Sequence, residues 1–198
     1  AEAVGLFFGI LCAQFRGKWP DYLLMVVAVL GIALPSMVLG PILRMIFGVK
    51  LGILPVTGWG KTNQIILPAL VLGLGTVAGN TRNMRASMLA ITTQDYVKTA
   101  RAKGLSPIRV VLKHQFKNSL VPIIPNLGVQ IAGVLMGSFV VESMFLIPGL
   151  GRYFVDSVTN LDYPLIMGLT VFYGAFLVTM NLIVDVLYGL IDPRIRVK

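Results

Sequence analysis

Chemically reactive and charged side chains are scarce in this sequence of 198 residues. It contains one cysteine and one histidine, and only 13% of its residues are charged. Cys12 has no partner for a disulfide within the chain, and one cysteine with the isolated His114 does not make a metal site. No GxxxxGK[ST] sequence occurs, so any ATP hydrolysis must take place on another chain. We therefore expect no enzyme, with no cofactor or metal bound by this chain.

Apolar residues, in contrast, are abundant. They make up 56% of the chain, and the mean hydropathy is +0.84. Soluble domains carry about twice this share of charged residues, so the composition suits a chain whose surface faces lipid. The net charge of +9 would also suit nucleic acid, but the basic residues lie between apolar stretches, as they do in cytoplasmic loops of membrane proteins. We expect a partner lipid bilayer and no nucleic acid.

Four charge-free stretches are long enough to cross the hydrocarbon core, which takes about 20 apolar residues. They cover residues 22–43, 62–81, 118–141 and 163–184. Because backbone groups in lipid must be paired internally, we expect helices over 22–43, 62–84, 118–141 and 163–187. Residues 1–15 are typical of the end of a further helix without the basic start of a secretory signal. The prediction is an all-α, multi-pass membrane protein, N-terminally incomplete, with one transmembrane domain over 1–198.

Lysine and arginine residues predict the orientation of these spans. The loops on one side carry two, eight and three of them, 13 in all, against three and one on the other side. The richer side is expected in the cytoplasm. This places the loop 85–117 and the C-terminus inside, and the acidic loop 142–162 outside.

The spans themselves contain polar but no ionisable side chains. The absence of ionisable groups at membrane depth argues against a proton-coupled carrier, although sodium sites can be built from carbonyls and hydroxyls. The polar residues have two interpretations, hydrogen bonding between helices or the lining of a polar passage. Those that we consider as possible pore-lining residues are Asn126, Gln130 and Asn181.

The loop 85–117 carries the most informative pattern. Residues 95–104 favour a short helix that ends at Gly104 in the left-handed conformation, with N-cap oxygens offered by Thr92, Thr93 and Asp95. Ser106-Pro107 predicts the start of a second helix. This second helix has a basic stripe of Arg109, Lys113 and Lys117 and an apolar stripe of Ile108, Val111, Leu112 and Phe116. The segment suits either anionic lipid headgroups or docking to another protein.

The same loop resembles a known family. Residues 95–105 read DYVKTARAKGL and are followed by His114, Asn118 and Leu120-Val121-Pro122. This resembles the EAA loop of permease subunits of ATP-binding-cassette importers, in the form of the dipeptide/oligopeptide (peptide/nickel) branch, although only Ala100 matches the general EAA pattern. The chain most resembles the first of the two permeases. The similarity extends to further stretches, which include Val141-Glu142, Ile147-Pro148-Gly149-Leu150-Gly151, Asp162-Tyr163-Pro164 and Asp192-Pro193-Arg194.

The resemblance implies a type I permease bundle in the bacterial cell membrane that imports peptides. Its implied partners are a second permease subunit, two ABC ATPase subunits that bind ATP and Mg²⁺, and an extracytoplasmic substrate-binding protein. The ATPase-coupling residues would be Asp95, Tyr96, Lys98, Thr99, Ala100, Arg101, Ala102, Lys103, Gly104 and Leu105.

Three alternatives to peptide import stay open. A permease of the same family could carry nickel or glutathione, and an ion-coupled secondary carrier or channel would need no ATPase. A membrane-embedded enzyme is disfavoured because paired carboxylates, HExxH and a serine–lysine set are missing at membrane depth.

The outer turn at Pro148, Gly149 and Gly151 suits either a plain connector or a docking surface for the binding protein.

Overall fold

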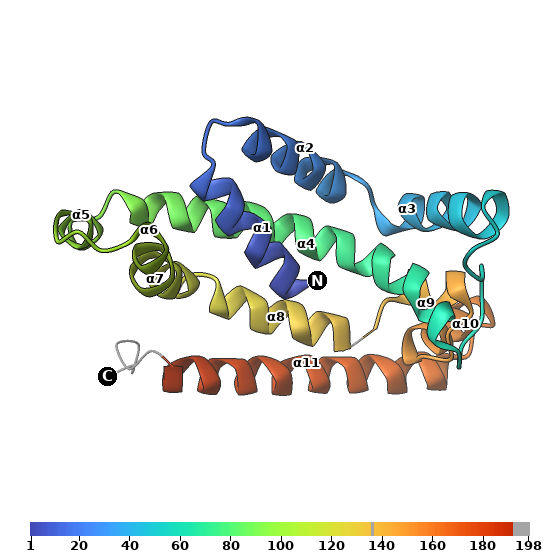
Figure 1. Ribbon diagram of the computed structural model, residues 1–198. Coiled ribbons are helices and arrows are strands. Elements are labelled where there is room, and N and C mark those ends of the chain that lie inside the picture. The colour runs from blue at the N-terminus through green and yellow to red at the C-terminus, as the bar shows by residue number, and fades with distance from the viewer. Residues whose placement is uncertain (136, 192–198) are drawn as a thin grey trace. The chain divides into compact units, whose positions relative to one another are not determined.

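The computed structural model describes residues 1–135 and 137–191, and every regular element in these ranges is helical. Two long helices, α4 (Thr62–Thr92) and α11 (Tyr163–Ile191), stand out in Figure 1. Both contain a stretch long and apolar enough to cross a membrane. The 31 residues of α4 extend for about 46 Å, well beyond the roughly 30 Å of hydrocarbon. The all-α prediction is confirmed, and α4 continues eight residues past its expected end at 84.

The prediction of one continuous helix over 22–43 is wrong. The chain forms α2 (Trp19–Ala33) and α3 (Ser36–Leu43), and α3 continues as the π-helical segment η1 (Arg44–Lys50). The break falls at Leu34 and Pro35, because proline lacks an N–H and disfavours helical backbone at the residue before it. Taken together, the helices on either side of this break count as a third candidate span.

The expected helix over 118–141 is also interrupted. It consists of α7 (Lys117–Leu120), α8 (Ile124–Leu135) and the start of α9 (Phe139–Phe145). Pro122 lies at the first break, where its missing N–H interrupts the helical hydrogen bonds, and Pro125 follows in the first turn of α8, where no helical partner is lost. At the second break Gly137 has a φ of +84°, and the Ser138 hydroxyl accepts the Val141 N–H at 3.4 Å as an N-cap. The expected outer loop 142–162 contains the end of α9 and a further helix, α10 (Leu150–Thr159).

The chain divides into two compact units, one mainly of residues 1–33 and 74–127, the other of 34–73 and 128–187. In the first unit α1 (Glu2–Gln14) lies across α4 (Figure 1). Gly5 and Gly9 make this close approach possible: a Cβ at Gly5 would lie 2.8 Å from the Val77 carbonyl oxygen, and one at Gly9 2.8 Å from that of Thr81. This is the small-residue spacing that lets membrane helices pack backbone to backbone.

The second unit is built around a cluster of fully buried apolar side chains. Leu67 and Val71 from α4 pack against Val141 and Phe145 from α9, each at most 3% exposed. Arg44 at the start of η1 donates to the Met144 carbonyl oxygen at 3.0 Å, which fixes η1 against the end of α9. A second contact set stacks Phe139 on Phe154 from α10, with Tyr173 of α11 at the edge of both rings.

Candidate coupling site

Helix α5 (Asp95–Ala102) and its C-terminal turn have the predicted form. Gly104 adopts a φ of +71°. Its N–H donates to the Arg101 carbonyl oxygen at 2.9 Å, and the Leu105 N–H donates to that of Ala100 at 3.4 Å. These two hydrogen bonds are the Schellman arrangement that satisfies the last carbonyls of a helix and turns the chain sharply. The prediction of a helix stopped by a left-handed Gly104 is confirmed.

The predicted N-cap of α5 is wrong. Gln94 occupies that position, and its side chain makes no capping hydrogen bond. The hydroxyls of Thr92 and Thr93 donate instead to the carbonyl oxygens of Met88 and Ala90 at the end of α4. Asp95 lies inside the first turn of α5, where its carboxylate accepts Lys98 at 2.9 Å. Because α4 continues to Thr92, the hydroxyls of these two threonines pair with carbonyl oxygens of α4 and do not cap α5.

A small apolar core holds α5 in place. Val97 and Ala100, which lie on one face of α5, are 0% and 4% exposed and pack with Val110, which is 2% exposed. Ile91 and Leu105 cover this cluster from either side. Of the ten proposed coupling residues, Ala100 and Leu105 therefore face inward. The remaining eight are exposed: Asp95, Tyr96, Lys98, Thr99, Arg101, Ala102, Lys103 and Gly104.

The second helix of the loop has a different register from the one expected. Pro107 starts α6 (Pro107–Arg109) after Ser106, and the chain continues as the π-helical η2 (Val110–Phe116). In a π-helix the hydrogen bonds run from i to i+5, and the two buried residues, Val110 and Gln115, are five apart. We refer to residues 95–116, which comprise α5, α6 and η2, as the knob.

The apolar stripe expected on this helix is half covered and half exposed. Val111 and Phe116 pack against Met84 and Met88 of α4. The other two residues, Ile108 and Leu112, are 72% and 58% exposed, and their role in docking or lipid binding stays a prediction. Together with Tyr96, which is 42% exposed, they give the knob an outward surface that mixes large apolar side chains with lysine and arginine.

Sequence reasoning missed an ion pair beside the knob. Asp21 in the first turn of α2 is 2% exposed. Its two carboxylate oxygens accept Arg85 Nε at 2.6 Å and Arg85 Nη2 at 2.7 Å, and Oδ2 also accepts the Gly17 N–H at 3.0 Å. Arg85 was counted only as a loop cation. The signal for this ion pair in the sequence was Asp21, an isolated acidic residue directly before an apolar stretch.

A second polar link missed from the sequence passes through Gln115. The Gln14 side-chain amide donates to Gln115 Oε1 at 3.3 Å, and Gln115 Nε2 donates to the Thr92 hydroxyl at 3.1 Å. Thr92 in turn donates to the Met88 carbonyl oxygen at 2.8 Å. Gln115 is 1% exposed, and its amide joins the ends of α1 and α4 to η2 through these partly buried hydrogen bonds.

The three candidate pore-lining residues differ in exposure. Asn126 is exposed, whereas Gln130 and Asn181 are half-buried. Asn181 Oδ1 is buried and has no hydrogen-bond partner within the part of the chain that is described. A buried amide oxygen of this kind needs a partner from water or another chain. Their role in a passage stays a prediction.

The outer turn is built around Glu142. Its carboxylate accepts the Arg152 N–H at 3.0 Å in the first turn of α10, where a negative charge is stabilised by the unpaired N–H groups and the helix dipole. A Cβ at Gly151 would lie 2.8 Å from Glu142 Oε2, and Cβ atoms at Gly137 and Gly149 would also collide with this carboxylate. The glycines therefore make room for Glu142, while Pro148 is exposed at the turn.

Replacing this carboxylate is expected to loosen the outer turn. Glu142→Ala removes the acceptor of the Arg152 N–H, which should cost about 1–3 kcal/mol. Limited proteolysis of the full-length protein in detergent should then cleave faster between 146 and 162. As a matched control, Asp156→Asn breaks only the exposed pair with Arg152, 3.6 Å apart, and exposed pairs contribute about 0–1 kcal/mol. Equal cleavage rates in the two variants would contradict this role of Glu142.

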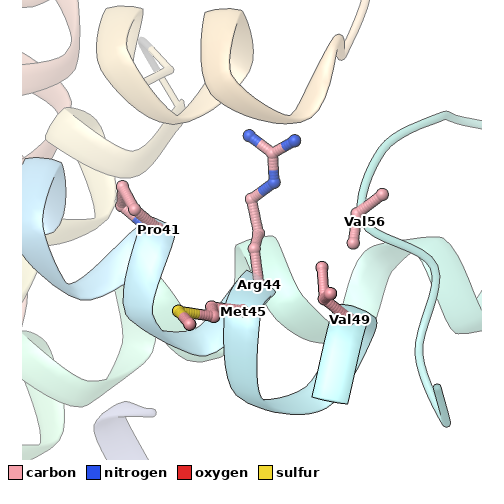
Figure 2. Close-up of a pocket in the computed structure, with 5 residues that line it drawn as sticks. All are labelled: Pro41, Arg44, Met45, Val49 and Val56. Carbon is pink, nitrogen blue, oxygen red and sulfur yellow. The ribbon is translucent and has the colours of Figure 1, made fainter. Parts of the chain in front are cut away.

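An open pocket lies in the second unit. Its volume is about 260 Å³, and it is lined by Pro41, Arg44, Met45, Val49 and Val56. Figure 2 shows the Arg44 guanidinium pointing away from Met45 and Val49, and this group is already bonded to the Met144 carbonyl oxygen. The remaining lining side chains are apolar, so the pocket offers little to orient a polar ligand. Across the described residues, no three His, Cys, Asp or Glu side chains gather as a metal site.

Two helices long and apolar enough to cross a membrane, together with an exposed, basic helical knob after the first of them, suit an integral membrane protein. The model of the family described as "binding-protein-dependent transport system inner membrane component" matches residues 5–197. The chain belongs to this family.

Two curated relatives are similar over nearly the whole chain. The dipeptide transport system permease protein DppB of Bacillus subtilis (strain 168) is 45% identical over 97% of this chain and 62% of its own length. The glutathione transport system permease protein GsiC of Escherichia coli (strain K12) is 44% identical over 100% of this chain and 65% of its own length. The chain thus spans less than two thirds of the length of these relatives.

Proposed function

We propose that this chain is the permease subunit of an ATP-driven importer for peptides and that the knob couples it to an ATPase. The observation that carries this proposal is the exposed surface of the knob, presented by α5 and η2 and set by the turn at Gly104. A polar and apolar surface of this kind, held on a small rigid core, suits a groove on another protein. Membership of a binding-protein-dependent transport family supports the same function.

The partners follow from the family and from the chemistry. Two ABC ATPases would bind ATP and Mg²⁺, a second permease would complete the passage, and an extracytoplasmic binding protein would deliver the substrate to the outer segment around Pro148 and Gly149. In this arrangement the knob and the C-terminus face the cytoplasm. Of the cations that predict this orientation, Arg194, Arg196 and Lys198 lie outside the described residues, as does the stretch Asp192-Pro193-Arg194.

A movement of the knob would be transmitted to the membrane helices because the knob is part of the same continuous chain. The knob is joined directly to α4 on one side and through α7 to α8 on the other. When ATP draws the two ATPases together, a displacement of the knob would tilt these helices and open the passage. Asn126, Gln130 and Asn181 are proposed to line it.

The substrate class rests on the relatives. A dipeptide permease and a glutathione permease are similar to this chain to nearly the same degree, 45% and 44%. Both names describe small peptides, so small peptides are the proposed substrate class. Uptake assays with labelled dipeptides, glutathione and Ni²⁺ in parallel distinguish these candidates.

The first test is affinity purification of the full-length protein from native membranes in mild detergent, with ATPase activity assayed on the eluate. ATPase subunits and a second permease should co-purify. Ile108→Glu, at a side chain that is 72% exposed, should reduce the recovered ATPase at least tenfold, about 1.4 kcal/mol of binding, without lowering the yield of the chain. Ile53→Glu, at a 62% exposed position outside the knob, is the matched control and should retain the ATPase.

Two other results would overturn this proposal. A chain that purifies alone and transports under an ion gradient is an ion-coupled carrier or channel. If the knob binds anionic vesicles equally well in the wild type and in Ile108→Glu, and no ATPase is recovered with either, the knob is only a lipid-binding segment.

A further inference from the structure

Two polar links tie the turn between α1 and α2 to the base of the knob. The first is the bidentate pair of Asp21 and Arg85, in which a 2% exposed carboxylate also accepts the Gly17 N–H of the turn itself. The second is the Gln14–Gln115–Thr92 chain. Gly17 has a φ of +73°, so the turn has the tight backbone that brings Asp21 back towards α4.

These links have a mechanical consequence. Arg85 lies on α4 seven residues before its end at Thr92, and Thr92 and Gln115 lie at the two places where the chain enters and leaves the knob. A bidentate guanidinium–carboxylate pair is directional as well as strong, and removing one partner would leave the other charge largely shielded from water without its counter-ion. A displacement of the knob therefore pulls on the α1–α2 turn mainly through the ion pair, because the other link to the turn is a single hydrogen bond of 3.3 Å between Gln14 and Gln115.

We infer that Asp21, Arg85 and Gln115 are positioning residues for coupling, which make the α1–α2 turn move together with the knob as one rigid body. This rests on the proposed function, in which an ATPase moves the knob. It adds α1 and α2 to the helices that respond, although they are not joined to the knob by chain continuity. A movement of the knob would then reach the passage by three routes: through α4, through α8 and through this turn.

The direct test is a distance between spin labels in the assembled full-length transporter. Lys18→Cys and Lys113→Cys place one label on the turn and one on η2, at exposed side chains outside both links, and the native Cys12 is buried. With wild-type links, the distance should stay the same with and without ATP. In Asp21→Asn it should broaden or shift between the two states. A wild-type distance that changes with ATP would overturn the inference.

Assays of transport and ATP hydrolysis give a second readout, which would not change if these residues had only a structural role. Asp21→Asn and Arg85→Lys should leave ATPase assembly and basal hydrolysis within about twofold, while substrate transported per ATP falls about tenfold, or 1.4 kcal/mol. If Asp21→Asn does not accumulate, Arg85→Lys keeps the charge but loses the bidentate geometry. Asp156→Asn, at the exposed ion pair with Arg152, is the control and should transport normally.

The outcomes separate this inference from the proposed function. Equal falls in transport and hydrolysis, or no change in transport per ATP in both variants, would overturn the positioning role and leave the importer intact. A wild-type chain that recovers no ATPase contradicts the importer itself, while the label distances in the full-length chain still show whether the turn and η2 form one rigid body.

Discussion

A Gly104→Val variant is expected to separate ATP hydrolysis from transport. Gly104 has a φ of +71°, and a Cβ there would meet no atom within 4 Å, so the effect of the substitution is conformational and not steric crowding. A left-handed backbone costs an L-residue about 1–2 kcal/mol, and β-branched residues tolerate it least. Relieving this strain opens the Schellman turn and changes the angle between α5 and the helix that follows. Substrate transported per ATP should fall at least tenfold, about 1.4 kcal/mol, in reconstituted vesicles.

Two substitutions at the same position serve as controls. Gly104→Asn should transport almost normally, because asparagine adopts left-handed backbone more readily than other side chains. Gly104→Ala should lie between asparagine and valine. If valine assembles with the ATPase and imports at the wild-type rate, Gly104 does not set the geometry of coupling. If asparagine and valine are equally damaging, the loss comes from the side chain on the surface and not from the backbone.

A Gly9→Leu variant is expected to have the largest effect on stability. A Cβ at Gly9 would lie 2.8 Å from the Thr81 carbonyl oxygen and 3.0 Å from the Arg85 nitrogen, and would collide with the Met84 side chain. Since these are mostly backbone atoms of α4, they cannot rotate away, and α1 must move outward. Overpacking of this kind costs about 1–3 kcal/mol, and the loss of the Thr81 bond to the Gly5 carbonyl oxygen adds to it. The Tm of the full-length chain in detergent should fall by roughly 5–10 °C.

Gly79→Leu is the matched control for this stability effect. Gly79 lies on α4 in the same unit, and a Cβ there would meet nothing within 4 Å. Measured on the full-length chain purified without partners, its Tm should stay within roughly 2 °C of the wild type. Equal losses at both glycines would show that leucine is tolerated poorly anywhere in this unit and that the α1–α4 approach has no special role.

The glycines of this chain show which features could be predicted from the sequence and which could not. Composition and the lengths of charge-free stretches were sufficient to predict an all-α membrane protein, since both depend only on hydropathy and on the thickness of a bilayer. The helix of α5 and the left-handed Gly104 were also predictable, because helix propensity and capping are local properties. Gly5 and Gly9, in contrast, carry no signal by themselves, because glycine is common in membrane helices.

Proline showed the limit of span prediction. Hydropathy counts Pro35 and Pro122 as acceptable members of a span, whereas the missing N–H and the steric restriction before the ring end the helix. The sequence stretches at 22–43 and 118–141 are therefore apolar but not single helices. In the knob, the π-helical η2 places Gln115 inside and Leu112 outside, which a regular period of 3.6 residues does not predict.

Hydropathy, helix capping and the sequence of residues 95–105 are enough to predict the class of protein, the knob with its Gly104 turn and the family resemblance. Which polar residues act together depends on the tertiary structure. Asp21 meets Arg85, 64 positions along the chain, and Gln14 meets Gln115, 101 positions along. Such pairs depend on how helices cross and on close backbone contact at glycines, and no local preference encodes them. The buried links at the base of the knob exist because α1 can lie directly against α4.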